Sequence, residues 1–345
     1  MTDDADILFE RRGHLGLITL NRPKALNALT HEMCVTMKAQ LDRWAKDGAV
    51  ETVAVQGAGE RAFCAGGDIR ALYESGKNKT PYALDFYRDE YRLNAAIKHF
   101  PKPYIAFIDG IVMGGGVGVS VHGSHRIAGA HITFAMPETG IGLFPDVGGS
   151  YFLPRIGGAI GFYLALTGAR LKLADCLYTG VATHFVPAEK HGAVIESFAE
   201  GCDPDAALGG HCGDAGEAPL VERAADIERI FMLDGVEAIL AALEKDGAEW
   251  ARDTAKIMRT KSPTSLKVTW RQLREGMKLG FDDCMQMEFR MVNRVVAGHD
   301  FYEGVRAAII DKDGAPKWQP AGLEHVSEAD VGAYFAPLGD KELKL

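Results

Sequence analysis

Residues 109–118 read DGIVMGGGVG, and this stretch carries the strongest fold signal in the chain. It follows a short apolar run at 104–108, which predicts a buried strand. The three glycines at 114–116 predict that a helix begins there, over residues 113–121. Because glycine has no Cβ, backbone N–H groups in such a run can approach a ligand closely.

Two more glycine-rich segments lie on either side of this run: 62–69, AFCAGGDI, and 136–149, MPETGIGLFPDVGG. Two facing segments of this kind can form an oxyanion hole from backbone N–H donors. The alternative is that all three are tight turns and close helix contacts. In the third segment, Glu138 and Asp146 each follow a proline. Paired carboxylates suit general acid–base or nucleophilic catalysis, although two solvated loop acids are the ordinary alternative.

The rest of the first two hundred residues alternates between strand and helix patterns, which is typical of an α/β fold. Residues 7–9 and 15–20 predict a hairpin around a turn at 12–14. Apolar residues recur at helical spacing over 31–46, after Thr30 as a helix N-cap. The further predicted strands are 50–55 and 132–135, and the further predicted helices are 159–167 and 173–178.

Composition changes after residue 200, which predicts three parts. Residues 1–200 are expected to form the catalytic core. Residues 201–223 are acidic and rich in glycine and alanine, which indicates a linker or loop. Residues 224–345 have mostly helical patterns and are expected to form a helical C-terminal region. The predicted helices are 224–233, 236–244, 249–259, 265–275, 282–297 and 301–310.

Composition also excludes several classes of protein. The chain has 345 residues, of which 47% are hydrophobic and 25% charged, so general disorder is excluded. The net charge of −9 argues against nucleic-acid binding. No apolar run is long enough for a membrane span, and the first ten residues do not read as a signal peptide. Six scattered cysteines indicate reduced thiols, so we expect a cytoplasmic protein, or one of the mitochondrial matrix in a eukaryote.

Together with NRPKALNAL at 21–29, the three glycine-rich segments resemble the enoyl-CoA hydratase/isomerase (crotonase) superfamily. The resemblance implies a crotonase (ClpP-like) spiral core of repeated ββα units with a helical C-terminal region. It implies that the N–H groups of Gly67 and Gly115 form the oxyanion hole. Further positions that it assigns to the bound CoA ester are Lys24 and Ala25 at the pyrophosphate and ribose, Ala65 and Ile69 along the adenine and pantetheine path, and Asp68.

Three positions discriminate between branches of this superfamily. A hydratase has its first catalytic glutamate where this chain has Gly118, its second is matched by Glu138, and it has glycine where this chain has Asp146. With Glu90 and the tail at 300–318, this pattern resembles the branch that hydrolyses 3-hydroxyisobutyryl-CoA in valine breakdown. The alternatives are a hydratase or isomerase that uses Glu138 alone and, less favoured, a non-catalytic binding protein of the same fold.

In that branch the thioester carbonyl would bind the two backbone donors, and Glu138 would either activate water or attack directly to give a mixed anhydride. Asp146 would orient the water or Glu138, and Glu90 would help hold the substrate hydroxyl. The expected partner is an acyl-CoA thioester, with no nucleic acid and no membrane. No metal or separate cofactor is expected, because CoA is part of substrate and product. A homo-oligomer is left open. Basic residues over 259–278 would either contact phosphates or form a solvated helix face.

Overall fold

The computed structural model describes residues 5–345, which divide into two compact units. The unit that we call the sheet unit comprises the chain up to Gly67, Arg92–Ala135 and Arg170–Val221. The unit that we call the helical unit comprises Asp68–Tyr91, Met136–Ala169 and Glu222–Leu345. Each unit is therefore assembled from three separate stretches of the chain. The predicted division at residues 200 and 223 stays a prediction.

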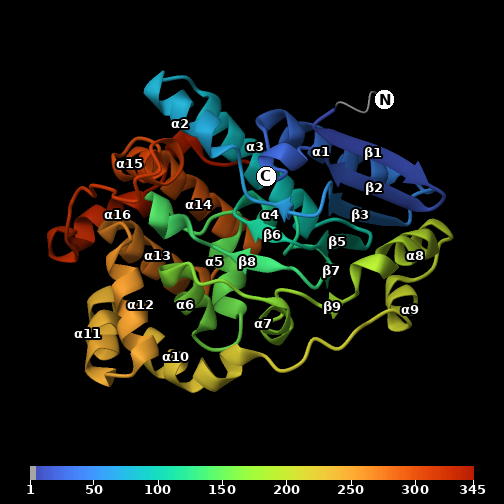
Figure 1. Cartoon of the computed structure of the whole chain (residues 1–345). Helices are drawn as coiled ribbons and strands as arrows, with labels where there is room; N and C mark the ends of the chain where they lie inside the picture. Colours follow the sequence, from blue (N-terminus) through green and yellow to red (C-terminus); the bar gives the residue numbers. More distant parts are fainter. Residues whose placement is uncertain (1–4) are drawn as a thin grey trace. The chain divides into compact units, whose positions relative to one another are not determined.

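The sheet unit contains two β-sheets (Figure 1). The larger has the order β1-β2-β3-β5-β7-β9, in which β1 and β2 form the predicted antiparallel hairpin and the other neighbours are parallel. The smaller is parallel, with the order β4-β6-β8. The strands are β1 (Ile7–Arg12), β2 (Leu15–Leu20), β3 (Thr52–Gly57), β4 (Ala62–Cys64), β5 (Tyr104–Ile108), β6 (Ile111–Met113), β7 (His125–Ala128), β8 (Thr133–Ala135) and β9 (His184–Phe185).

The order of the strands confirms the predicted repeats. In each of the pairs β3–β4, β5–β6 and β7–β8, the first strand belongs to the larger sheet and the second to the smaller sheet. The first repeat ends with α1 (His31–Lys46), which has the predicted bounds. It begins where Thr30 Oγ1 accepts a hydrogen bond from Met33 N at 3.2 Å, and it buries Met33, Met37 and Leu41 one helical turn apart.

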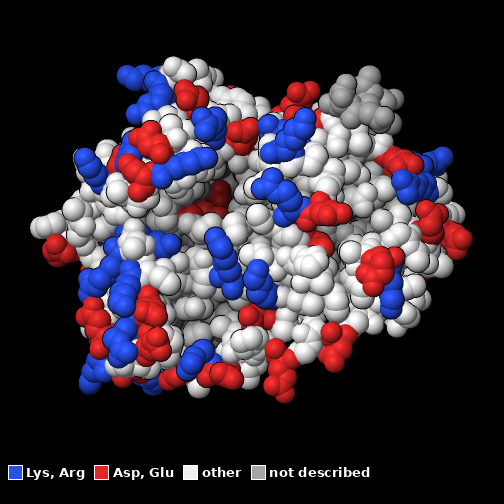
Figure 2. Space-filling view, in the orientation of Figure 1, with Lys and Arg blue, Asp and Glu red and all other residues white. Residues whose placement is uncertain are grey.

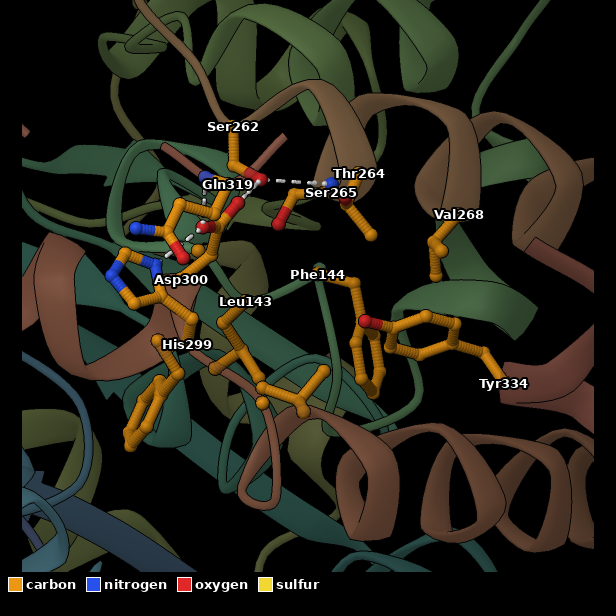
Figure 3. Close-up of a pocket in the computed structure, with 14 residues that line it drawn as sticks. Leu143, Phe144, Ser262, Thr264, Ser265, Val268, His299, Asp300, Gln319 and Tyr334 are labelled. Atoms are coloured by element: carbon orange, nitrogen blue, oxygen red, sulfur yellow. Dashed lines mark hydrogen bonds and ion pairs between the residues drawn. The ribbon is translucent and has the colours of Figure 1, made fainter. Parts of the chain in front are cut away.

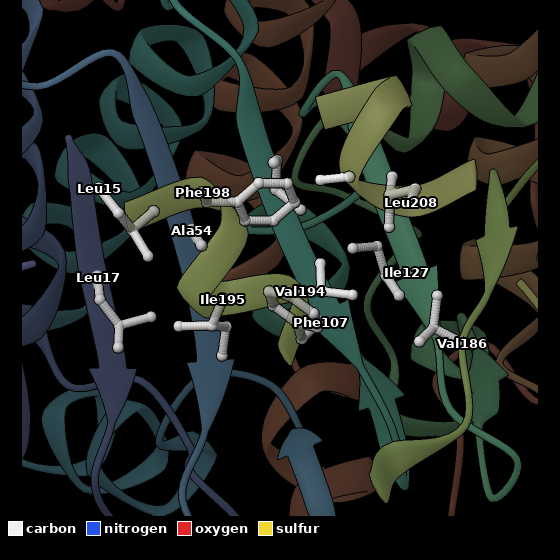
Figure 4. Packing of buried hydrophobic residues seen from close by; sticks show 12 residues of the cluster. Leu15, Leu17, Ala54, Phe107, Ile127, Val186, Val194, Ile195, Phe198 and Leu208 are labelled. Carbon is white, nitrogen blue, oxygen red and sulfur yellow. The ribbon is translucent and has the colours of Figure 1, made fainter. Parts of the chain in front are cut away.

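The core of the sheet unit lies between the larger sheet and two helices, α8 (Ala188–Ala199) and α9 (Pro204–Gly209) (Figure 4). Phe198 and Leu208 from these helices pack with strand residues such as Leu17 and Ile127. The stretch predicted as a linker or loop therefore contains a packed helix. α9 begins there because Asp203 Oδ1 accepts hydrogen bonds from the amides two and three residues on, Asp205 N at 3.0 Å and Ala206 N at 3.2 Å.

The glycine run at 114–116 also differs from its prediction. Strand β6 continues to Met113, and only the four residues of α4 (Gly115–Gly118) are helical where a helix over 113–121 was predicted. Gly114 explains the difference, since its φ of 47° and ψ of −122° are not helical and separate strand from helix. Strand β3 likewise begins two residues later than predicted, because a turn from Val50 N to Asp47 O precedes it.

Helices form most of the helical unit, and the bounds of the predicted ones follow the prediction within a few residues, whereas the helices at 69–77, 82–98, 149–152 and 328–335 were not predicted. The first part of α3 (Tyr82–Lys98) belongs to this unit and its last part to the sheet unit. The others are α2 (Ile69–Lys77), α5 (Gly149–Phe152), α6 (Ile160–Thr167), α10 (Ala224–Phe231), α11 (Val236–Asp246), α12 (Glu249–Arg259), α13 (Pro263–Gly276), α14 (Phe281–Val295), α15 (Asp300–Val305) and α16 (Glu328–Phe335), while α7 (Leu173–Tyr178) lies in the sheet unit. A π-helical turn, Arg306–Ile310, follows α15, so the predicted helix at 301–310 has two parts.

Charged residues on α10–α12 form ion pairs at the surface. Figure 2 shows blue and red side chains intermixed at the lower left, where these helices lie in Figure 1. Arg229 pairs with Asp246 at 2.6 Å, and on α13 Lys267 pairs with Glu237 at 2.6 Å. Such pairs favour the solvated-face interpretation of the basic residues over 259–278. Within residues 5–345, no helix is both long and apolar enough to cross a membrane.

Candidate active site

The loop at 21–29, which contains the predicted CoA-binding residues Lys24 and Ala25, is held against the glycine-rich segment at 62–69 by Asn27. This buried side chain donates from Nδ2 to the carbonyls of Ala58 and Ala62, each at 2.9 Å, and its Oδ1 accepts from Arg22 N at 2.9 Å. The backbone adds Leu29 N to Gly66 O at 2.8 Å. Two segments some forty residues apart are thereby fixed side by side in the sheet unit.

The two predicted oxyanion donors lie in neighbouring loops of the sheet unit. Gly67 follows β4 and Gly115 follows β6, and these strands are paired in parallel. A Cβ built on Gly66 would stand 3.9 Å from Gly115 N, so the two loops touch. A Cβ on Gly116 would stand 2.2 Å from Cys64 O, which is why this contact requires glycine. Neither Gly67 N nor Gly115 N donates a hydrogen bond to another described residue, so both are free to bind an oxyanion.

The other predicted substrate-binding positions are at or near the surface. Lys24 and Ala25 are exposed on the short 3₁₀ turn Pro23–Ala25, and Ala65 is half-buried in the loop after β4. Asp68 is the N-cap of α2, where its Oδ1 accepts from Ala71 N at 3.4 Å, and Ile69 is the first residue of that helix. A capping role explains Asp68 without a ligand, and its role toward substrate stays a prediction.

The predicted carboxylates are all buried in the helical unit. Glu138 begins the 3₁₀ turn Glu138–Ile141, three residues after the end of β8. Asp146 lies in the loop before α5, and Glu90 lies on α3. Only 5% of Glu138, 4% of Asp146 and 2% of Glu90 are exposed. The alternative of solvated loop acids is therefore wrong.

Asp146 is joined to α3 through Tyr91, whose hydroxyl donates to Asp146 Oδ2 at 2.9 Å. Tyr91 follows Glu90 directly and is itself fully buried. The segment before Asp146 is fixed from another side, since Gln272 Nε2 on α13 donates to Pro145 O at 2.6 Å. Asp146 is therefore held between two helices whose residues lie 55 and more than 120 positions away in the chain.

A fourth buried carboxyl, Glu288 on α14, was missed from the sequence. It is fully buried and accepts from Gly148 N at 2.8 Å, from Ser150 N at 2.9 Å and from the Ser150 hydroxyl. These bonds hold the turn directly after Asp146, in which Gly148 has a φ of 87°. The neighbouring residues of α14 offered no signal, because the partners of Glu288 lie about 140 positions earlier.

Burial raises the pKa values of all four carboxyls, and neighbouring charges raise those of Glu90, Glu138 and Glu288 further. Burial, followed by the charges of Asp146, Glu138 and Glu288, holds the pKa of Glu90 well above its usual range. Burial and the charge of Asp146 do the same for the pKa of Glu138. The pKa of Asp146 rises to about 7 through burial, against the Tyr91 hydrogen bond, and burial raises the pKa of Glu288 to about 8. Such groups can exchange protons near neutral pH.

One base from the stretch 259–278 lies near this group. Lys261 Nζ would stand 3.3 Å from a Cβ on Gly140, two residues after Glu138. Its charge favours the ionised form of Glu138, whereas its own burial lowers the pKa of the lysine. No group of three or more His, Cys, Asp or Glu side chains in the described part of the chain is arranged to hold a metal ion.

A separate cavity in the helical unit lies beside Ser262, Asp300 and Tyr334 (Figure 3). Its volume is about 40 Å³, which is room for one or two water molecules and not for an acyl group. The Asp300 carboxylate accepts from Ser262 Oγ at 2.6 Å and from Gln319 N at 2.8 Å. Since Ser262 N also donates to Thr139 O at 3.2 Å, this network supports the backbone next to Glu138.

The three glycine-rich segments follow the same edge of the smaller sheet because its strands are parallel. Strands β4, β6 and β8 are parallel, so their carboxyl ends lie at one edge. Gly67, Gly115 and Glu138 follow those ends by three, two and three residues. Within the sheet unit, Gly67 N and Gly115 N are backbone donors in two loops that touch. Within the helical unit, the buried carboxyl of Asp146 has a pKa raised to about 7.

A fold of repeated ββα units with two backbone donors after paired parallel strands defines a class of enzymes that act on CoA thioesters. The chain belongs to the enoyl-CoA hydratase/isomerase family, whose sequence profile matches residues 15–335. Binding of an acyl-CoA is implied by membership of this family.

Curated relatives show which members of this family the chain is similar to over its full length. The chain is 48% identical to the mitochondrial 3-hydroxyisobutyryl-CoA hydrolase of Danio rerio, over 99% of this chain and 92% of the relative. It is 45% identical to the human protein of the same name, with the same coverage. Among solved structures, it is similar to a carnitinyl-CoA dehydratase from Mycobacterium thermoresistibile, with a TM-score of 0.94, 44% identity and 99% of both chains covered. An enoyl-CoA hydratase from Rhodobacter sphaeroides matches with a TM-score of 0.93 and 39% identity, over 99% of this chain and all of that one.

Proposed function

We propose that the chain hydrolyses 3-hydroxyisobutyryl-CoA, or a closely related 3-hydroxyacyl-CoA, to the free hydroxy acid and CoA. The observation that carries this proposal is the pair of buried carboxyls Glu138 and Asp146, together with Gly118 where a hydratase has its other acid. The full-length similarity to 3-hydroxyisobutyryl-CoA hydrolases supports the same reaction, and through it a place in valine breakdown.

In the proposed reaction the thioester carbonyl oxygen accepts hydrogen bonds from Gly67 N and Gly115 N. Negative charge gathers on this oxygen when the carbonyl carbon is attacked, and one such donor is worth about 2.7–4 kcal/mol of transition-state stabilisation. Glu138 acts on the carbonyl carbon, either by taking a proton from water or by direct attack that releases CoA and leaves an anhydride for water to cleave. Its raised pKa makes it a stronger base than an exposed glutamate.

Asp146 has the role of orienting the attacking water or Glu138. Tyr91 fixes the carboxyl for this purpose by donating to one of its oxygens, Oδ2. Glu90 is proposed to contact the substrate hydroxyl, since its Oε1 is buried and has no hydrogen-bond partner among the described residues.

A second candidate is hydration of an enoyl-CoA, because the two most similar structures above carry the names of a dehydratase and a hydratase. Hydration adds a proton and a hydroxide across a double bond and needs two carboxylates positioned for these steps. Gly118 is a buried residue at the end of α4 and supplies no carboxylate. This difference favours hydrolysis.

The test is free-thiol release from (S)-3-hydroxyisobutyryl-CoA, measured with a thiol reagent. Hydration of crotonyl-CoA is followed in parallel by the loss of enoyl absorbance. Thiol release without hydration is the expected result. Hydration without thiol release would replace the proposed hydrolase with the second candidate.

We also propose that the protein works in a reducing compartment, the cytoplasm or, in a eukaryote, the mitochondrial matrix. The six cysteines all lie in the described part of the chain and form no disulfide, and two of them, Cys202 and Cys212, are exposed. The relatives named above are described as mitochondrial. A homo-oligomer stays open.

A further inference from the structure

One face of helix α3 is directed toward the loop that contains Asp146. Tyr87, Glu90 and Tyr91 are spaced three and four residues apart and therefore lie on the same side of the helix. All three are buried, and the hydrogen bond from the Tyr91 hydroxyl to Asp146 Oδ2 shows which way this side faces. The rings of Tyr87 and Tyr91 pack edge to face, with their centroids 6.0 Å apart.

Several buried polar atoms near this face have no hydrogen-bond partner in the described part of the chain. Besides both side-chain polar atoms of Asn94, one turn beyond Glu90, three belong to the candidate site: the Tyr87 hydroxyl, Glu90 Oε1 and Glu138 Oε2. Buried polar atoms are nearly always paired, because an unpaired one has lost its hydrogen bonds to water. Three unpaired atoms around one catalytic pair indicate a place for a polar group of the substrate.

The Tyr87 hydroxyl differs in kind from the carboxyls beside it. Burial and the charges of Asp146, Glu90 and Glu138 raise its pKa well above the usual range. The phenol therefore keeps its proton at any working pH and is a permanent donor, whereas ionised carboxylates can only accept. A donor and an acceptor on the same side of one helix match an alcohol, which accepts with a lone pair and donates its own hydrogen.

We propose that Tyr87 determines the preference for a 3-hydroxyacyl group: its hydroxyl donates to the substrate's 3-hydroxyl oxygen, and Glu90 accepts the hydrogen of that hydroxyl. This inference rests on the proposed function, because it concerns the acyl group of the same thioester. An acyl chain without the hydroxyl leaves both protein groups buried and unpaired, which is how a polar pocket rejects an analogue that lacks one hydroxyl.

The experiment compares kcat/KM for thiol release from 3-hydroxyisobutyryl-CoA and from isobutyryl-CoA in the wild-type enzyme and in Tyr87→Phe. We expect the preference for the hydroxylated ester to fall about tenfold, the factor that one neutral hydrogen bond supplies. The value of kcat/KM falls for 3-hydroxyisobutyryl-CoA, while kcat/KM for isobutyryl-CoA stays the same or rises. Tyr334→Phe is the matched control, since Tyr334 is a half-buried tyrosine of the separate cavity whose pKa is also raised by burial and by the charge of a carboxylate, Asp300, and its removal leaves the preference unchanged.

Equal losses on both esters in Tyr87→Phe would overturn the specificity role and leave the hydrolase proposal intact. If wild-type enzyme released thiol from neither ester, the proposed function itself would fail, and this inference with it. If isobutyryl-CoA is cleaved too slowly to follow, the same ratio is taken from the inhibition constants of the two non-cleavable thioether analogues. A ratio unchanged by Tyr87→Phe would then overturn the inference.

Discussion

Replacing Tyr91 with phenylalanine removes a single hydroxyl whose hydrogen bond favours the ionised form of Asp146. The bond is 2.9 Å long and fully buried. A hydrogen bond to a charged group contributes about 1.5–3 kcal/mol. Since one pKa unit corresponds to about 1.4 kcal/mol, the pKa of Asp146 should rise by about one to two units from its value of about 7.

The sign of the effect follows from which form of Asp146 is useful. The ionised carboxylate accepts hydrogen bonds from water on either oxygen, whereas the protonated carboxyl presents an O–H donor on one of them, so activity rises with pH as Asp146 loses its proton. In Tyr91→Phe this acid limb moves to higher pH by about one to two units. At pH 7 the ionised fraction, and with it the rate, falls about five- to fiftyfold, and the rate recovers above pH 9.

The assay is kcat/KM for thiol release between pH 5.5 and 10. The apparent pKa of the acid limb of the pH–rate profile belongs to the coupled carboxyls as a group. The quantity compared is therefore the shift of this apparent pKa between wild type and Tyr91→Phe. Tyr104→Phe is the matched control, because the Tyr104 hydroxyl is equally buried and donates over the same 2.9 Å, but to the neutral carbonyl of Val119. An unmoved limb in Tyr91→Phe, or a loss that high pH does not restore, would refute the reasoning.

Three further predictions concern the carboxyls and the glycine run. Glu138→Gln abolishes thiol release but retains binding of the CoA ester by calorimetry, because the amide keeps the shape and loses the base. Glu288→Gln removes a carboxyl that holds its proton more tightly in the folded chain, with a pKa of about 8. The free energy of unfolding, measured by urea titration at several pH values, then falls less steeply with rising pH in this variant than in wild type. Between pH 5 and 8 the difference in slope is up to about 1.4 kcal/mol per pH unit. Gly116→Ala places a Cβ against Cys64 O and lowers the free energy of unfolding by about 1–3 kcal/mol, again measured in urea.

Each of these expectations has a result that contradicts it. Near-normal CoA release by the Glu138 variant would exclude it as the catalytic group. A Glu288 variant with the wild-type slope of stability against pH would mean that this carboxyl is ionised in the folded chain at pH 7. A Gly116 variant as stable as wild type would show that the loops after β4 and β6 do not touch as described.

Elements with local signals were predictable from the sequence. The bounds of α1 were confirmed because Thr30 supplies its own cap, and β5 and α12 were confirmed because each is a regular apolar pattern. Helix α3 was not predicted, although Phe86, Tyr87 and Leu93 have helical spacing within it. Recognising this helix would have placed the two tyrosines beside Glu90.

Features that depend on distant contacts were not predictable. Glu288 has the sequence surroundings of an ordinary helix acid, and its burial results from amides about 140 residues earlier. The burial of Asp146 depends in the same way on Tyr91 and Gln272, which lie on two other helices. Glu138 and Asp146 were singled out from their places in a glycine-rich segment, and Glu90 from the family resemblance. The folded structure adds that burial and neighbouring charge shift the ionisation of Glu90 and Glu138.

The crowding of carboxyls has a consequence for the end of the reaction. A thioester's acyl group is neutral, whereas the hydroxy acid that replaces it is an anion at neutral pH. Beside Glu90, Glu138 and Asp146, in surroundings that already raise their pKa values, that anion meets like charge and little water to screen it. In the proposed reaction, the side chains that promote cleavage would therefore also repel the cleaved acid. Charge would then distinguish product from substrate, and turnover would be protected from accumulation of the product.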